Sequence, residues 1–386
     1  MFQEPPKLKS IFFTGFLMSL HLALTAYVNS SFLSEYFSEK TVGLLFTFGS
    51  IAAIIAFLLI PRALRRLGGY KFLLGAVASS AILLFLLSIE KSAWVIVPAF
   101  VLYITFNNII IFSLDELVEI FSKNSRVGKI RGLYLAIASS AWVVAQIILG
   151  KILGNFSFRV VYFISFEIMT FLLIFAFFFL RKIPDPKYDR ARILGFVKKF
   201  FKNKNLARSY KINFLLQFFY AWMVIYTPIY LSSHLGFTWK EIAMIFTIML
   251  TPFVFMPIPL GKYADKIGER KMLMFGFAIA SLATFSIFFI KLHAVWLWAL
   301  LLFTSRIGAA TIEVMSDVYF FKHIDPENDE FIGLYRNTMP VAYVLAPLLA
   351  FLVFSFTPSF NYIYIILGGI MLYGVYLAST IRKGDI

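Results

Sequence analysis

The chain has 386 residues, of which 60% are hydrophobic and only 15% are charged. A soluble domain of this length does not need so much apolar surface, so the composition indicates membrane spans. The formal net charge is +16, but the basic residues lie in short segments between apolar runs. There they act as topology signals and contacts for anionic lipid rather than as a nucleic-acid surface. Cysteine is absent, which excludes disulfides and thiolate chemistry.

Apolar runs long enough to cross a bilayer, which takes about 20 residues, predict twelve transmembrane helices. The first apolar run is too long for a signal-peptide core and has no clear cleavage site, so we interpret it as the first span. The predicted spans are residues 10–30, 41–61, 71–89, 93–114, 132–153, 159–180, 210–231, 241–261, 271–291, 294–317, 333–355 and 360–381.

Lysine and arginine are distributed unequally over the two sides that these spans define. Of the 36 residues, 29 lie on the side that holds both termini, six lie on the other side, and Arg306 lies within a span. Basic residues accumulate on the cytoplasmic side of membrane proteins. We therefore expect a multi-pass protein of the inner (plasma) membrane with both termini in the cytoplasm.

The domain organisation that we predict has two six-helix bundles, residues 1–181 and 209–386, joined by a cytoplasmic linker at 182–208. In the linker, apolar residues recur at helical spacing among lysines, which predicts a basic amphipathic helix on the inner membrane face; a solvated linker is the alternative. The apolar positions are Ile193, Phe196, Val197, Phe200 and Phe201. Before the eleventh span, Asp325-Pro326 predicts a helix N-cap followed by proline.

Two groups of residues recur about 200 positions apart. Gly68, Lys71 and Leu73 align with Gly268, Lys271 and Leu273. At nearly the same offset, Gly132-Leu133-Tyr134 recurs as Gly333-Leu334-Tyr335, and Asp115 corresponds to Asp317. We call these two recurring groups the landmarks of the repeat. Because both recur at nearly the same offset, they indicate that the chain contains two copies of one unit.

The better copy of the first landmark is a short basic loop between two spans. Its spaced residues are Gly261, Asp265, Lys266, Gly268, Arg270 and Lys271. This pattern resembles the cytoplasmic signature of the major facilitator superfamily, which joins helices two and three and again helices eight and nine. The resemblance implies an all-α membrane fold of twelve helices, with two six-helix bundles related by pseudo-twofold symmetry.

In that family the signature aspartate holds the two halves together when the protein opens outward. The resemblance gives Asp265 this gate role, with the start of the eleventh helix near Gly333 as its partner and Asp317 as a further member. A carboxylate favours a helix N-terminus and nearby cations, and the glycines permit a tight turn.

Two positions depart from the family pattern. Glu269 stands where a basic residue is expected, so Arg270 or Lys266 would supply the cation. In the first copy Arg65 replaces the aspartate, and we hypothesise that it meets Asp115 or Glu116. Solvated loop charges without such pairing are the alternative.

Charged side chains inside a span are costly, by about 2.5–3.5 kcal/mol on insertion scales, and therefore mark functional candidates. Arg306, Glu313 and Asp317 are spaced by seven and four residues, which places them on one face of the tenth helix. In the resembling family helices one, four, seven and ten line the central path, so this face is interpreted as pathway.

The other expected lining helices carry weaker polar stripes. His21 could titrate near neutral pH, or it could be a hydrogen-bonded packing residue. Glu167, in the middle of the sixth span, is expected to pair within its own bundle or to belong to the pathway. The stripe residues are Thr14, His21 and Thr25 on the first helix, Asn108 and Asp115 on the fourth, and Asn213, Gln217, Tyr220 and Thr227 on the seventh.

These patterns predict a secondary transporter that moves a small solute by alternating access and is coupled to protons. Glu313 is the expected proton carrier, with Arg306 as its counter-charge. One alternative is an uncoupled facilitator in which Arg306 is structural or binds an anionic substrate. The other is a receptor or lipid scramblase on the same fold.

Other classes of function receive no support from the sequence. A phosphate-binding glycine loop followed by Lys-Ser/Thr is missing, and the four histidines are scattered, so we expect no enzyme, no ATP hydrolysis, no metal and no cofactor. Ala145-Gln146 stands where drug/proton antiporters of the resembling family have a glycine-proline-glycine pattern, which disfavours multidrug export. The expected partners are a small-molecule substrate, protons and membrane lipids, with no nucleic acid and with a monomeric chain.

Overall fold

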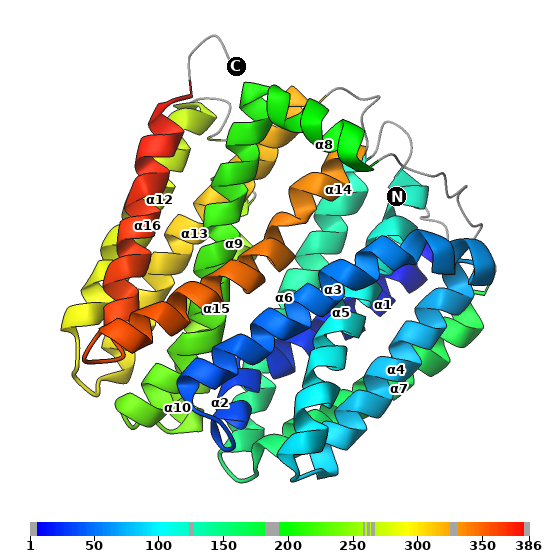
Figure 1. Cartoon of the computed structure of the whole chain (residues 1–386), viewed down its shortest axis with the longest axis horizontal. Helices are drawn as coiled ribbons and strands as arrows, with labels where there is room; N and C mark the ends of the chain where they lie inside the picture. Colours follow the sequence, from blue (N-terminus) through cyan, green and yellow to red (C-terminus); the bar gives the residue numbers. More distant parts are fainter. Residues whose placement is uncertain are drawn as a thin grey trace. The chain divides into compact units, whose positions relative to one another are not determined.

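A computed structural model describes residues 6–122, 127–181, 193–257, 259–260, 263, 267–324 and 330–381 (Figure 1). Within these ranges every regular element is a helix. Eleven helical segments are long and apolar enough to cross a membrane, which confirms the predicted all-α membrane fold. Large apolar side chains such as Phe178, Leu282 and Phe356 are exposed, as expected for helices whose outer faces meet lipid.

The chain divides into two compact units, residues 1–190 and 191–386. The first unit contains α1 (Pro6–Ala26), α2 (Asn29–Ser34), α3 (Glu39–Leu67), α4 (Gly69–Ile89), α5 (Ala93–Ser122), α6 (Val127–Leu153) and α7 (Phe158–Phe179). The second contains α8 (Ile193–Lys202), α9 (Lys204–Ile229) with a π-helical extension η1 (Tyr230–His234), α10 (Trp239–Phe255), α12 (Glu269–Phe289), α13 (Val295–His323), α14 (Glu330–Arg336), α15 (Thr338–Phe356) and α16 (Tyr362–Ser379).

Each predicted span has a helical counterpart. The first corresponds to α1 and α2, and the eleventh to α14 and α15, because a break divides each helix near one end. The 17 residues of α10 lie at the lower limit of a membrane-crossing length. Helices α5 and α13 continue past the predicted ends at 114 and 317 as far as Ser122 and His323, because a helix can extend beyond its apolar run.

The two units repeat one packing scheme. In the first, α4 packs against α5 and α7, α3 against α5, and α1 against α5, α6 and α7. In the second, α12 packs against α13 and α16, α10 against α13, and α9 against α13, α15 and α16 (Figure 1). Span by span these are the same pairs, so the internal repeat seen in the sequence is a repeat of helix packing.

The glycine landmark of the repeat marks a shared backbone conformation. Gly68 has φ 74° and ψ 154°, and Gly268 has φ 83° and ψ 147°; each directly precedes a helix, α4 or α12. Residues with a side chain avoid this region of positive φ. A Cβ on Gly268 would meet no atom of the described residues within 4 Å, so the backbone angle, not the available space, requires glycine there.

Small residues let α12 and α13 approach closely. A Cβ built on Gly308 of α13 would lie 2.6 Å from the Gly276 carbonyl oxygen and 2.6 Å from the Ala280 nitrogen of α12. No real Cβ tolerates such contacts, so this crossing depends on glycine, as is common between membrane helices. The contact holds one face of α13 against α12.

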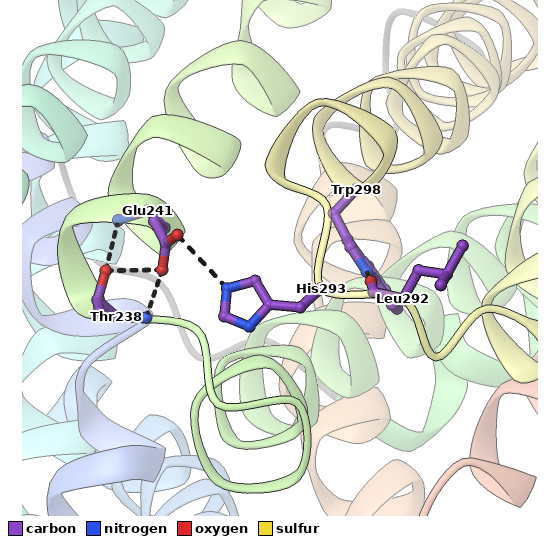
Figure 2. A network of polar contacts seen from close by, with 5 residues as sticks. All are labelled: Thr238, Glu241, Leu292, His293 and Trp298. Atoms are coloured by element: carbon purple, nitrogen blue, oxygen red, sulfur yellow. Dashed lines mark hydrogen bonds and ion pairs between the residues drawn. The ribbon is translucent and has the colours of Figure 1, made fainter.

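The start of α10 is tied to the loop before α13 by the polar network of Figure 2. Thr238 and Glu241 form a capping box, in which the Glu241 carboxylate accepts from the Thr238 nitrogen at 2.8 Å. His293 Nε2 lies 3.4 Å from the other Glu241 oxygen. Trp298, at the start of α13, donates to the Leu292 carbonyl at 2.9 Å, so both helix starts are fixed to one loop.

The predicted linker helix is present as α8, and it belongs to the second compact unit. Phe200 is fully buried in a cluster with Leu206, Phe320, Phe331 and Tyr335, whereas the neighbouring Phe201 is 43% exposed. The apolar face of α8 is therefore covered, at Phe200, by its own unit rather than by lipid. The side chains of Ile193 and Phe196, and the Asp325-Pro326 pair, lie outside what the structure describes.

Candidate functional site

The charged face of α13 packs against the aromatic side chains of α9. Arg306 is only 1% exposed. Its guanidinium carbon lies 5.1 Å from the ring centroid of Phe219 and 5.6 Å from that of Tyr220, which are cation–π distances. Arg306 Nε and Nη1 are buried and find no hydrogen-bond partner among the described residues. The arginine is thus held by two rings while donors on its guanidinium stay unsatisfied.

Glu313 lies two helical turns further along the same face. The Tyr220 hydroxyl donates to Glu313 Oε2 at 2.8 Å, so Tyr220 contacts Arg306 with its ring and Glu313 with its hydroxyl. Within the described part of the chain, no carboxylate lies within ion-pair distance of Arg306. The predicted face of α13 is present, but its basic and acidic members have separate partners.

The third charged residue of this face, Asp317, accepts a hydrogen bond from the Tyr335 hydroxyl at 3.0 Å. The backbone carbonyl of Tyr335 accepts from Asn213 Nδ2 at 3.4 Å, and that amide also donates to Thr338 Oγ1 at 2.8 Å. A polar chain therefore runs from α13 through the α14–α15 break to α9.

On α9, Gln217 joins this chain, because its Nε2 lies 3.5 Å from Asn213 Oδ1. Thr227, which the sequence placed on the same stripe, instead donates to Met223 Sδ at 3.5 Å. Of the four α9 residues, three thus belong to the polar chain or to the contact with Glu313.

In the first unit, His21 lies at the centre of a fully buried network. His21 Nε2 is 3.3 Å from Asn107 Oδ1 and 3.3 Å from the Tyr103 hydroxyl. Thr25 is hydrogen-bonded to Tyr103 at 2.7 Å, and Ser80 donates to Asn107 at 3.1 Å. Thr14 is buried and donates to the carbonyl of Ser10 on its own helix. The contacts join α1, α4 and α5, an arrangement that fits the hydrogen-bonded packing interpretation of His21.

The remaining candidates of the first unit lie apart from this network. Asn108 donates to the Ile104 carbonyl of its own helix at 2.9 Å. Asp115 is partly buried near the end of α5, and Arg65 is exposed at the end of α3, so their proposed contact stays a prediction. Glu167 lies on the exposed side of α7.

The signature loop is described only in part, since Gly261, Asp265 and Lys266 lie outside the described residues. The gate contact between Asp265 and the region of Gly333 therefore stays a prediction. Arg270 and Lys271 lie in the first turn of α12. Glu269 is 2% exposed and forms an ion pair with Lys322 at the end of α13, a cation that the sequence reasoning did not propose.

Sequence reasoning missed several residues that complete these clusters. In a chain so rich in aromatic and apolar residues, no sequence pattern singles out Phe219, Tyr103 or Asn107. Tyr335 did carry a signal, because it belongs to the repeated Gly-Leu-Tyr landmark. The repeat had also singled out Asp317, and the structure shows that the two are hydrogen-bonded.

Comparisons with known proteins agree with this architecture. The sequence profile of the Major Facilitator Superfamily matches residues 11–240 and 212–384. No curated protein sequence matches the chain. A crystal structure of a mutant of the nucleoside transporter NupG covers 96% of this chain and 98% of its own, with TM-score 0.78 and 13% identity. The peptide transporter POT in complex with sulfate covers 98% and 94%, with TM-score 0.75 and 12% identity.

At such low identities the two structures establish the fold alone. The profile match, in contrast, extends over nearly the whole chain, and the membrane-crossing helices agree with it. The chain therefore belongs to the major facilitator superfamily of multi-pass membrane transporters.

Proposed function

We propose that the protein is a secondary transporter that moves a small solute by alternating access and couples this movement to protons bound at Glu313. The observation that carries the proposal is the hydrogen bond from Tyr220 to Glu313, between two spans that the family places along its central path. We place both termini in the cytoplasm and the protein in the inner membrane, because 29 of the 36 lysines and arginines lie on the side that holds the termini.

Glu313 is suited to carry a proton because it lies within a membrane span. A carboxylate within a span is costly unless it is paired, hydrated or protonated. Among the described residues, Glu313 has the Tyr220 hydroxyl as its hydrogen-bond partner, and part of its surface stays accessible. Binding a proton removes its charge, so its protonation state changes the energy of any conformation that buries the group further.

Arg306 acts on Glu313 from a distance in this arrangement. Seven residues along a helix correspond to about 10.5 Å of rise, and two unit charges so separated interact by about 1–2 kcal/mol at an effective dielectric constant of 20. This attraction favours the ionised form of Glu313, but it is too weak to keep the carboxylate permanently ionised. The geometry thus supports long-range influence of Arg306 in place of the direct counter-charge expected from the sequence.

Proteoliposomes containing the purified protein test the coupling. Nucleosides, dipeptides, sugars and organic acids are offered with and without an inward proton gradient. We expect gradient-driven accumulation of one class, its loss in Glu313→Gln, and retained exchange of solute in that variant. Glu90→Gln removes a carboxylate in the other unit and serves as the control. Gradient-driven accumulation that persists in Glu313→Gln would remove the coupling role of Glu313, and uptake that is unaffected by a collapsed gradient would identify an uncoupled facilitator.

Transport of any kind requires an aqueous route to the site. The chain has no cysteine, so single cysteines can be introduced at Gln217 and Ala310 on a clean background. We expect a charged thiol reagent to label at least one of them, at a rate that changes when solute is added. If neither position is labelled under any condition, the protein is a receptor or scramblase rather than a transporter.

A further inference from the structure

We propose that Arg306 binds the anionic group of the transported solute, a carboxylate or a singly charged phosphate ester on an apolar body. The proposal rests on the transport function proposed above and adds the chemical class of the solute. It starts from the most unusual feature of the second unit, a fully buried arginine with unsatisfied donors.

The described partners of Arg306 do not satisfy its hydrogen-bonding capacity. Phe219 and Tyr220 contact the cation through their ring faces, which offer no acceptor for in-plane hydrogen bonds. The Tyr220 hydroxyl donates to Glu313 and the Tyr335 hydroxyl donates to Asp317. Nε and Nη1 of Arg306 are left without acceptors in the described part of the chain. Each acid on α13 therefore has a donor, whereas these two nitrogens of Arg306 have no acceptor among the described residues.

Cation–π contacts alone do not explain an arginine in this place. The attraction between a guanidinium and aromatic rings is weaker than the free-energy cost of removing the guanidinium from water. A group that is so costly in a span is retained when it serves the function. An oxyanion would satisfy both the charge and the donors, because the planar guanidinium matches the oxygen geometry of carboxylate and phosphate.

The surroundings narrow the class of anion. Glu313 and Asp317 lie two and three turns away on the same face, so a ligand with several negative charges would be repelled. Tyr220 also packs against Phe253, with ring centroids 6.0 Å apart, which gives the site aromatic walls. A monoanion with an apolar or aromatic body fits these walls and the single cation.

The burial of Arg306 also fixes when the solute can enter. With 1% of its surface exposed, the guanidinium is closed off in this conformation. The solute therefore binds in another conformation, in which the guanidinium beside the rings of Phe219 and Tyr220 is accessible.

Equilibrium binding tests the assignment without any gradient. The purified protein is placed in phosphatidylcholine nanodiscs, and its melting temperature is measured with benzoate, with the phosphodiester methyl phenyl phosphate, which carries a single negative charge, and with the neutral isostere benzamide. We expect benzoate or methyl phenyl phosphate to stabilise the protein saturably and benzamide to have no effect. Affinity should fall at least tenfold in Arg306→Gln. It should be unchanged in Lys211→Gln, which removes a cation from an exposed position of α9.

Two further measurements separate binding from folding. Without ligand, Arg306→Gln should melt at the wild-type temperature or above it, because an unsatisfied buried charge is removed. Arg306→Lys, which keeps the charge without the planar fork, should fold and bind the probes more weakly than wild type. A large loss of stability in both variants would show that Arg306 is structural and would overturn the proposal.

The following results would each count against one of the two proposals. Equal binding by wild type and Arg306→Gln, or no stabilisation by either anionic probe, would refute the assignment. A separate arm with phosphatidylglycerol nanodiscs covers a lipid headgroup; stabilisation through Arg306 by this lipid alone would refute a soluble solute. Binding of the probes through Arg306 by a wild-type protein that transports none of the offered solutes would instead remove only the proposed transport function.

Discussion

Lys322, in the last turn of α13, donates to the carboxylate of Glu269 in the first turn of α12. Glu269 is buried, with 2% of its side chain exposed, whereas 43% of the Lys322 side chain is exposed. The pair accounts for the acidic residue that departs from the basic signature of the family. The cation comes from the end of the neighbouring helix instead of from the loop itself.

The unequal burial of this pair predicts unequal effects of removing its members. Lys322→Met leaves a buried carboxylate without its partner, which costs about 1–3 kcal/mol, and should lower the melting temperature markedly. Glu269→Gln leaves a lysine that can reach water, and should cost less. The double variant should be more stable than Lys322→Met alone. Equal effects of both single changes, with simple additivity in the double variant, would argue against the pair.

The shared backbone angle of the two landmark glycines predicts that neither tolerates a side chain. Gly68→Ala and Gly268→Ala should each destabilise the protein by about 1–3 kcal/mol, because an L-residue is strained at this positive φ with extended ψ. Gly369→Ala is the matched control, since it lies inside α16 and its Cβ would meet no atom within 4 Å. It should be neutral or slightly stabilising. Thermal unfolding of purified protein measures all three; a Gly268→Ala variant as stable as the control would contradict the strain argument.

The anchoring of α8 predicts a sharp contrast between two adjacent phenylalanines. Phe200→Ala removes a fully buried ring from the cluster with Phe331 and Tyr335 and should cost about 3 kcal/mol. Phe201→Ala, at a position that is 43% exposed, should cost far less. Limited proteolysis should cut the linker faster only in the first variant. Similar behaviour of both variants would indicate that α8 is not held by the second unit.

The exposed position of Glu167 on the membrane-spanning helix α7 predicts that replacing this residue stabilises the protein. Glu167 shares the exposed side of α7 with Phe163 and Phe171, and the structure gives it no hydrogen bond or ion pair with a described residue. A carboxylate that faces hydrocarbon is costly, by about 2.5–3.5 kcal/mol at the centre of a span. Glu167→Leu should raise the melting temperature and leave transport unchanged, with Phe163→Leu as the control. A loss of stability or transport would reveal a partner for this group.

The sequence determined the number of spans and the internal repeat, because both depend on local properties. The length of an apolar run is set by the thickness of the bilayer, and a helix fixes which residues share its face. For this reason the alignment of Gly68 with Gly268, and the common face of Arg306, Glu313 and Asp317, could be predicted without coordinates.

The tertiary structure decided which polar groups meet, because the rotation and neighbours of each helix arise from packing between distant segments. Asn107 and Asn108 differ by one position, or about 100° around α5, and only the first faces His21. Packing likewise gave Glu269 its partner Lys322 and buried Phe200 against its own unit. It also left Arg306 between two rings, with donors that no described residue satisfies.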